Sequence, residues 1–444
     1  KMIKRITLSV CILLSFGLQA QHSFSVKEAQ EYGLQNNRTI KNAVLEVGIA
    51  SKQMKETISI GLPQVNAEAQ WQKFLTVPTT LVPAGAFGGE PTENSPQYIE
   101  MQFGLPHTST VSITASQLIF NGSYIVGLKA SKSFMEFARM RKTLTKHQIS
   151  DSIATAYYNV LLARENSDFL ESIVEVHKTI VNEVEALYNA GFVEDIEVDR
   201  MALVLSKMEM QYANIYRRTE ISEAYLKLML GIELAETLVL SDSLPKLLDS
   251  SISFKLEESN TKQRIEYQMA AMKADLKELD LRRYQTDKLP TIAAFGSINT
   301  SSMGNDFTAF ESNSSWYPSQ MVGLKISIPI FDGLGGAARI QKARLVWEQA
   351  KNDKIQMQEN LALAHLSAQS NFINASSDYT HQEHNLALAK KIYEKTLAKY
   401  REGLVSSLEL SQAGTEYLQT NTNFSKSIYD LLITNLNYQR SLGK

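Results

Sequence analysis

The sequence predicts an internally duplicated α+β membrane protein, in which pairs of β-strands alternate with helices of exceptional length. The ten prolines are clustered, with six between residues 63 and 106 and three between residues 290 and 329. Residues 121–241 and 331–444 contain no proline, and glycine is rare in both tracts. The same landmarks also occur twice along the chain at nearly constant spacing. Each observation specifies one part of the fold.

The two proline-free tracts predict very long helices. Both are rich in Ala, Leu, Lys, Glu and Gln, the residues that lose least on entering a helix. From Gly122 to Tyr188 the helix would be about 100 Å long at about 1.5 Å per residue. Helices of this length require coiled-coil-like packing side by side.

The two proline-bearing windows predict strands, because they show apolar alternation and β-branched residues. We expect β-hairpins over 62–120 and 289–331, each with a loose polar or Gly/Pro-rich tip. The four expected strands are Pro63–Trp71, Val111–Phe120, Pro290–Asn299 and Val322–Phe331.

The landmarks of the first half recur in the second half. Tyr188 and Gly191 recur as Tyr400 and Gly403, 212 positions later. The residues Leu62-Pro63 recur as Leu289-Pro290 at an offset of 227, so the first hairpin is longer. We therefore expect two structural repeats, each with a helix, a hairpin, a long helix, a tip turn near residue 191 or 403, and a helix. The expected boundaries are a signal peptide at 1–20, a first repeat at 21–240, a linking segment at 241–259 and a second repeat at 260–444.

The first twenty residues have a basic start, an apolar run and small residues near Ala20, which predicts a secretory signal peptide. A membrane anchor is the alternative, but the apolar run is short for a span. The only cysteine, Cys11, would leave with this peptide. No later run of eighteen apolar residues follows, so we expect a periplasmic, secreted or outer-membrane β-barrel protein.

The number of strands bears on the number of chains. Two hairpins supply four strands, too few to close a barrel, and an open sheet in lipid would leave its edges without hydrogen-bond partners. Three chains would supply twelve strands, an even number typical of such barrels. We therefore expect a homotrimer.

Several classes of function are disfavoured. The net charge of −2 shows no basic excess, so we expect no nucleic-acid partner. No Ser-His-Asp order, phosphate-binding glycine loop or paired-carboxylate site stands out, and we expect no enzyme, catalytic residue or cofactor. His381 and His384 lack a third ligand nearby, and an exposed polar helix face is the better interpretation, so we expect no metal site.

The chain resembles the outer-membrane efflux protein family of the TolC type. The resemblance is carried by residues 24–65, the corners QLIFNG and IPIFDG, both Tyr-x-x-Gly turns and the terminal Leu-Gly pairs. It implies a trimeric 12-stranded outer-membrane β-barrel continuous with a long α-helical periplasmic barrel. It also implies a passive exit duct that works with a periplasmic adaptor protein, an inner-membrane transporter of the RND or ABC type and outer-membrane lipid. The cargo, whether drug, metal or protein, is chosen by the pump.

The resemblance also implies candidate site residues at the periplasmic helix tips. Helix-tip turns and the adaptor contact are expected at Gly191, Phe192, Val193, Gly403, Leu404 and Val405. The pore constriction is expected at Glu409, Gln412, Tyr400, Glu197, Asp199, Arg200 and Tyr188. In the family an Asp commonly stands where Glu409 is and forms a ring, and a second acid stands where Gln412 is, so one charged layer is expected here.

Two kinds of alternative remain open at this point. Glu197 and Glu409 could lie on solvated helix faces, and the apolar tip residues could pack between neighbouring helices. The whole chain could also be a periplasmic or secreted coiled-coil scaffold or adhesin without a pore, although that class predicts few strands.

Overall fold

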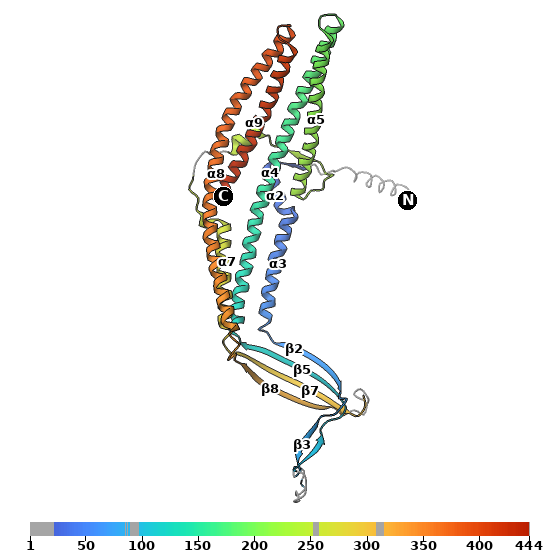
Figure 1. The fold of residues 1–444 in the computed structure, drawn as a ribbon, viewed down its shortest axis with the longest axis vertical. Helices are drawn as coiled ribbons and strands as arrows, with labels where there is room; N and C mark the ends of the chain where they lie inside the picture. Colours follow the sequence, from blue (N-terminus) through green and yellow to red (C-terminus); the bar gives the residue numbers. More distant parts are fainter. Residues whose placement is uncertain are drawn as a thin grey trace, which may run out of the picture. The chain divides into compact units, whose positions relative to one another are not determined.

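A computed structural model describes residues 22–84, 86, 88, 97–251, 257–307 and 315–443 of the chain (Figure 1). The expected signal peptide and parts of both hairpin tips lie outside these residues. The chain divides into two compact units, which we treat separately. The helical unit comprises Lys1–Gly48, Glu136–Lys273 and Ala350–Lys444, and the strand unit comprises Ile49–Met135 and Ala274–Gln349.

Helices make up most of the described chain. Two of them, α4 (Gly122–Asn189) and α8 (Gly335–Arg401), have 68 and 67 residues. Each is followed by a helix of 36 residues, α5 (Asp195–Leu230) or α9 (Ser407–Leu442). The shorter helices are α2 (Val26–Asn36), α3 (Arg38–Ser59), α6 (Leu244–Ser251), the 3₁₀ turn η1 (Thr261–Gln263) and α7 (Ile265–Thr286). Within the described residues, none of the helices combines the length and apolarity that a bilayer span requires.

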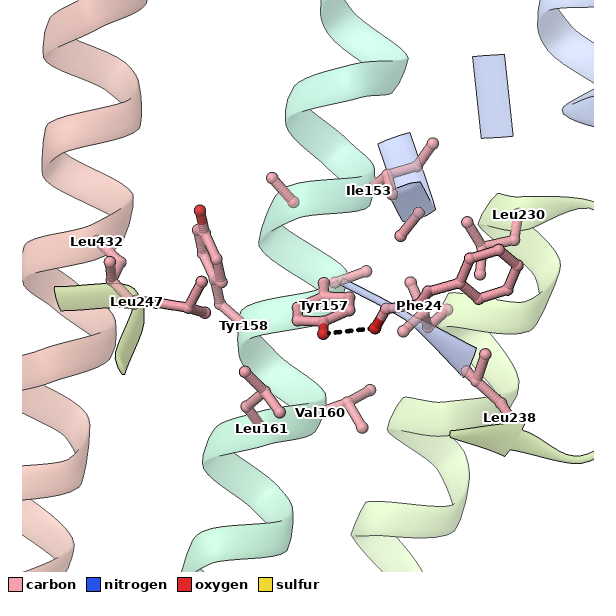
Figure 2. Packing of buried hydrophobic residues seen from close by; sticks show 14 of the residues in the cluster. Phe24, Ile153, Tyr157, Tyr158, Val160, Leu161, Leu230, Leu238, Leu247 and Leu432 are labelled. Atoms are coloured by element: carbon pink, nitrogen blue, oxygen red, sulfur yellow. Dashed lines mark hydrogen bonds between the residues drawn. The ribbon is translucent and has the colours of Figure 1, made fainter. Parts of the chain in front are cut away.

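The largest core cluster of the helical unit surrounds the start of the described chain. Strand β1 (His22–Phe24) pairs in parallel with β6 (Leu238–Leu240), a short sheet that the sequence did not predict. Figure 2 shows the hydroxyl of Tyr157, on α4, donating to the carbonyl oxygen of Phe24 at 2.8 Å. The same hydroxyl donates to the Asp242 carboxylate at 3.1 Å. Burial, with the Asp242 charge, raises the pKa of Tyr157, so the hydroxyl keeps its single proton, which the two acceptors share.

The strand unit contains a four-stranded antiparallel sheet. Its order is β2 (Gln64–Lys73), β5 (His107–Phe120), β7 (Thr291–Gly304) and β8 (Tyr317–Ser327). Both expected strand pairs are therefore present, and β5 joins them by pairing with β7. Two expectations need correction. Strand β8 ends at Ser327 rather than Phe331, because Pro329, two residues further on, has no N–H to donate to a strand neighbour. The first hairpin continues into a second ladder, β3 (Thr79–Pro83) with β4 (Tyr98–Gln102), where we expected only a loop.

The four-stranded sheet has one apolar and one polar face. Successive residues along each strand point to opposite faces, and residues paired across neighbouring strands share a face. One apolar row across the sheet is Val65, Ala115, Gly296 and Val322. A polar row on the opposite face is Glu68, Ser112, Asn299 and Ser319. This alternation is typical of strands with lipid on one side and an aqueous lumen on the other.

Candidate functional site

Both long helices end in the same kind of turn. Gly191 has φ 80° and its N–H donates to the carbonyl of Tyr188 at 2.9 Å. Gly403 has φ 72° and makes the equivalent bond to Tyr400 at 2.9 Å. A Cβ at either glycine would meet no atom within 4 Å, so glycine is required by the left-handed backbone and not by crowding. The structure thus places a chain reversal at each Tyr-x-x-Gly sequence.

The apolar residues of the two turns differ in exposure. Phe192 is 78% exposed and Leu404 is 67% exposed. Val193 and Val405 are half-buried. Val193 packs against the core, whereas Phe192 and Leu404 present large apolar side chains to solvent in this chain. Exposure within one chain therefore separates these residues, and which of them meet a partner stays a prediction.

A buried cluster joins the two helix hairpins, α4–α5 and α8–α9, near these turns. We call it the tip cluster, and its six buried residues are Ile180, Val184, Met201, Tyr393, Leu410 and Ala413. Three of them lie on the first hairpin and three on the second. Tyr400 packs against the cluster, whereas its counterpart Tyr188 is 46% exposed. The two tyrosines thus occupy different environments despite their equivalent positions in sequence.

Near the turns, two polar links also cross between the hairpins. Arg200 on α5 lies 3.2 Å from Glu197 and 3.4 Å from the hydroxyl of Ser407, at the start of α9. Arg401 on α8 lies 3.4 Å from Glu183 on α4. Partly exposed ion pairs contribute about 0–1 kcal/mol each, so the apolar tip cluster supplies most of the contact.

The sequence indicated only part of this polar network. Arg200 and Glu197 were expected there, but Ser407, Arg401 and Glu183 were not. A basic residue in the last turn of a helix is a readable signal for Arg401. Glu183 carries no signal, since its partner is 218 positions away.

The remaining gate candidates differ in burial and in their hydrogen bonds. Burial raises the pKa of Tyr400, and the carboxylates of Glu197 and Glu183 add to the effect. Glu409, Gln412 and Asp199 are exposed. Glu409 also has a local role, because the Ser406 hydroxyl accepts from its N–H at 3.3 Å and donates to its carboxylate at 3.2 Å. Glu409 therefore helps to cap α9.

One buried residue beside the tip cluster was not anticipated. His177 on α4 is 1% exposed, and a Cβ at Gly414 on α9 would lie 3.5 Å from its Nε2. Within the described part of the chain, neither this nitrogen nor the Tyr393 hydroxyl has a hydrogen-bond partner. Burial lowers the pKa of His177, so the ring is neutral at pH 7. Its only signal in the sequence is a histidine among apolar residues of a long helix.

The fold and the amphipathic sheet define the class of an outer-membrane channel. Residues 262–444 match the family model described as outer membrane efflux protein. Over 345 residues the chain is 21% identical to the outer membrane protein TolC of Vibrio cholerae, covering 75% of this chain and 76% of that protein.

Solved structures give the same result for the fold. CusC, whose structures describe transmembrane channel formation, has a TM-score of 0.73 at 19% identity, with 94% of this chain and 92% of that chain covered. The CmeC outer membrane channel of Campylobacter jejuni has a TM-score of 0.71 at 18% identity, with 94% and 85% covered.

These matches confirm the resemblance to the outer-membrane efflux protein family that the sequence indicates. They confirm the fold class, a β-barrel with an α-helical barrel, and the outer-membrane location. Efflux is transport rather than catalysis, so the prediction that the protein is not an enzyme is confirmed by the family match. The number of chains and the internal duplication stay predictions.

Proposed function

We propose that the protein is the exit duct of a tripartite efflux or type I secretion system. In this proposal it passively conducts cargo from an inner-membrane transporter of the RND or ABC type, through a periplasmic adaptor, to the outside. The observation that supports it most is the four-stranded sheet with one apolar and one polar face. A coiled-coil scaffold or adhesin has no use for such a sheet.

The sheet edges support assembly of three copies. In the described strands, β2 and β8 each pair with one neighbour in the sheet, so both outer edges carry unpaired backbone groups. In lipid these groups require partners. Pairing β8 of one copy with β2 of the next satisfies them, and three copies close a barrel of twelve strands.

The outer helices support the same assembly. Along α5, exposed Ile196, Leu203 and Met210 recur every seven residues. Along α8, exposed Leu366 and Ile373 have the same spacing. Apolar residues at heptad spacing pack against neighbouring helices in coiled coils. We infer that these two stripes meet the helices of adjacent copies and close a helical barrel.

The gate is assigned to the helix tips. In a trimer Glu409 would form one charged ring facing the pore, and Gln412 would form a neutral layer next to it. The entrance would be held closed around this ring by five residues: Tyr400, Tyr188, Glu197, Asp199 and Arg200. The adaptor would meet the two turns. Its contacts would be the exposed Phe192 and Leu404, together with Val193, Val405, Gly191 and Gly403.

Recording of single channels in planar bilayers tests this function. We expect the protein to fractionate with the outer membrane of the cell. Once purified, it should form conducting pores. Glu409→Gln removes the charge but keeps a side chain suited to the capping box, so helix capping is preserved. We expect this variant to change conductance or cation preference, whereas Glu359→Gln, on an exposed face of α8, should not.

Two outcomes of these recordings would argue against parts of the proposal. Unchanged conductance and selectivity in Glu409→Gln would argue against a ring at that position. Protein that forms no pore and remains in the soluble fraction would refute the duct.

A further inference from the structure

The strand unit contains two strand-to-helix corners with nearly the same sequence. The first is Ile-Phe-Asn-Gly at 119–122, between β5 and α4. The second is Ile-Phe-Asp-Gly at 330–333, between β8 and α8. Phe120 in the first corner is half-buried, whereas Phe331 in the second is 80% exposed. The difference lies in what surrounds each corner.

The first corner is covered on both sides by the chain itself. On one side lies the α3–β2 turn, residues 58–62, where Tyr124 donates to the Ile58 carbonyl at 3.1 Å and Gln117 donates to the Gly61 carbonyl at 2.8 Å. On the other side lies the α7–β7 turn, residues 286–291. There a Cβ at Gly122 would come within 3.0 Å of the Leu289 side chain.

The second corner is covered on one side only. The end of α7 and the α7–β7 turn flank it through Tyr284, Asp287 and Lys288, around a cavity of about 310 Å³. On its other side the sheet ends, because β8 is an edge strand. The exposed apolar side chains there include Phe331, Ile330 at 95% and Leu334 at 71%.

The backbone of the second corner is strained at the exposed position. Leu334 has φ 68° and is the one residue other than glycine with positive φ in the described chain. Side chains rarely adopt this conformation unless the surroundings impose it. The Asp332 carboxylate bridges the turn around this residue, because it accepts from the Gly336 N–H and from Arg339 at 3.0 Å. The chain thus maintains strain that leaves a leucine exposed to solvent beside Phe331.

We propose that Phe331 and Leu334 of one copy pack against the α3–β2 turn of the next copy. This inference rests on the proposed duct, since it requires a closed ring of copies. The α7–β7 turn contacts the corners on both of its sides, whereas its counterpart, the α3–β2 turn, contacts one corner. The α3–β2 turn itself has exposed apolar residues, Ile60 at 57% and Leu62 at 53%.

Strand pairing brings the same two surfaces together. When β8 of one copy pairs antiparallel with β2 of the next, the end of β8 lies beside the start of β2. Leu62 lies two residues before β2, and Phe331 lies four residues after β8. The partner of this surface is therefore a second copy of this chain. Its α3–β2 turn would cover the second corner in the same way that the α7–β7 turn covers the first corner within one copy.

Cysteine crosslinking tests this contact. Cys11 is the chain's only cysteine, and a Cys11→Ser background removes it in all variants. We combine Leu334→Cys with Ile60→Cys in one chain and treat the assembled protein with an oxidant or a short bis-maleimide. We expect covalent dimers and trimers on denaturing gels. Each single-cysteine variant, which lacks a partner thiol at the contact, should remain monomeric.

The outcomes separate this inference from the proposed function. A trimer by native mass with no crosslinked species under either reagent would overturn the contact and leave the duct standing. The absence of any trimer would refute the duct itself. Leu334→Gly provides a second test, because it relieves the backbone strain but removes the apolar contact. We expect a trimer that dissociates at lower temperature, and an unchanged or more heat-resistant trimer would also overturn the inference.

Discussion

Leu410→Ala should loosen the contact between the two helix hairpins at their tips. Leu410 is 0% exposed and lies in the tip cluster, facing Ile180 and Val184 of α4 and Met201 of α5. Truncating a fully buried leucine costs about 2–5 kcal/mol, which corresponds to roughly 30- to 4,000-fold in an equilibrium. This free energy is an upper bound on the change in the equilibrium for separating the two hairpins, because some of the contacts that Leu410 loses lie within the second hairpin.

The matched control is Leu408→Ala. Leu408 is two residues away on the same helix but 52% exposed, so its truncation should change stability by no more than about 0.5 kcal/mol. We expect Leu410→Ala to raise the open probability of single channels and to speed hydrogen exchange at the start of α9. If Leu410→Ala and Leu408→Ala are indistinguishable in both measurements, the tip cluster does not hold the hairpins together.

Two further predictions concern buried polar groups. Burial lowers the pKa of His177, so its contribution to hairpin contact is complete above about pH 6.5 and is lost as pH falls from there through the lowered value. The protection factor of the tip amides, which is the intrinsic exchange rate at each pH divided by the observed rate, should therefore fall between pH 7.5 and 5. The fall should be smaller in His177→Gln and as large as in the parent in the exposed control His381→Gln. Equal falls in all three would contradict this. Tyr157→Phe removes one donor to the Phe24 carbonyl, which still accepts from the Ser241 N–H at 3.0 Å, so we expect a cost of about 0.5–1.5 kcal/mol. Thermal unfolding in detergent should show the loss, and an unchanged midpoint would mean that the bond contributes nothing.

The long helices and paired strands were predictable because local composition determines them. Proline is excluded from helix interiors, so its absence over residues 121–241 and 331–444 indicates helix without knowledge of any contact. The tip glycines were predictable for a related reason, since a left-handed residue at a helix end strongly favours glycine. Strands of three residues, such as β1 and β6, are too short to leave a periodic pattern.

Contacts between helices were not predictable in the same way. The approach of His177 to Gly414, or of Arg401 to Glu183, depends on how one helix is rotated against another. Spacing along one helix shows which residues share a face but not which residue of another helix lies opposite. The capping role of Glu409 is visible in the sequence, because Ser406 stands three residues earlier at capping-box spacing.

The proposed duct requires that three copies close one barrel from strands that a single chain leaves open at both edges. The most direct test is the mass of the purified particle in detergent, by native mass spectrometry or by light scattering corrected for bound detergent. We expect three times the chain mass, as required for twelve strands. A stable monomer or dimer that still conducts in bilayers would contradict it.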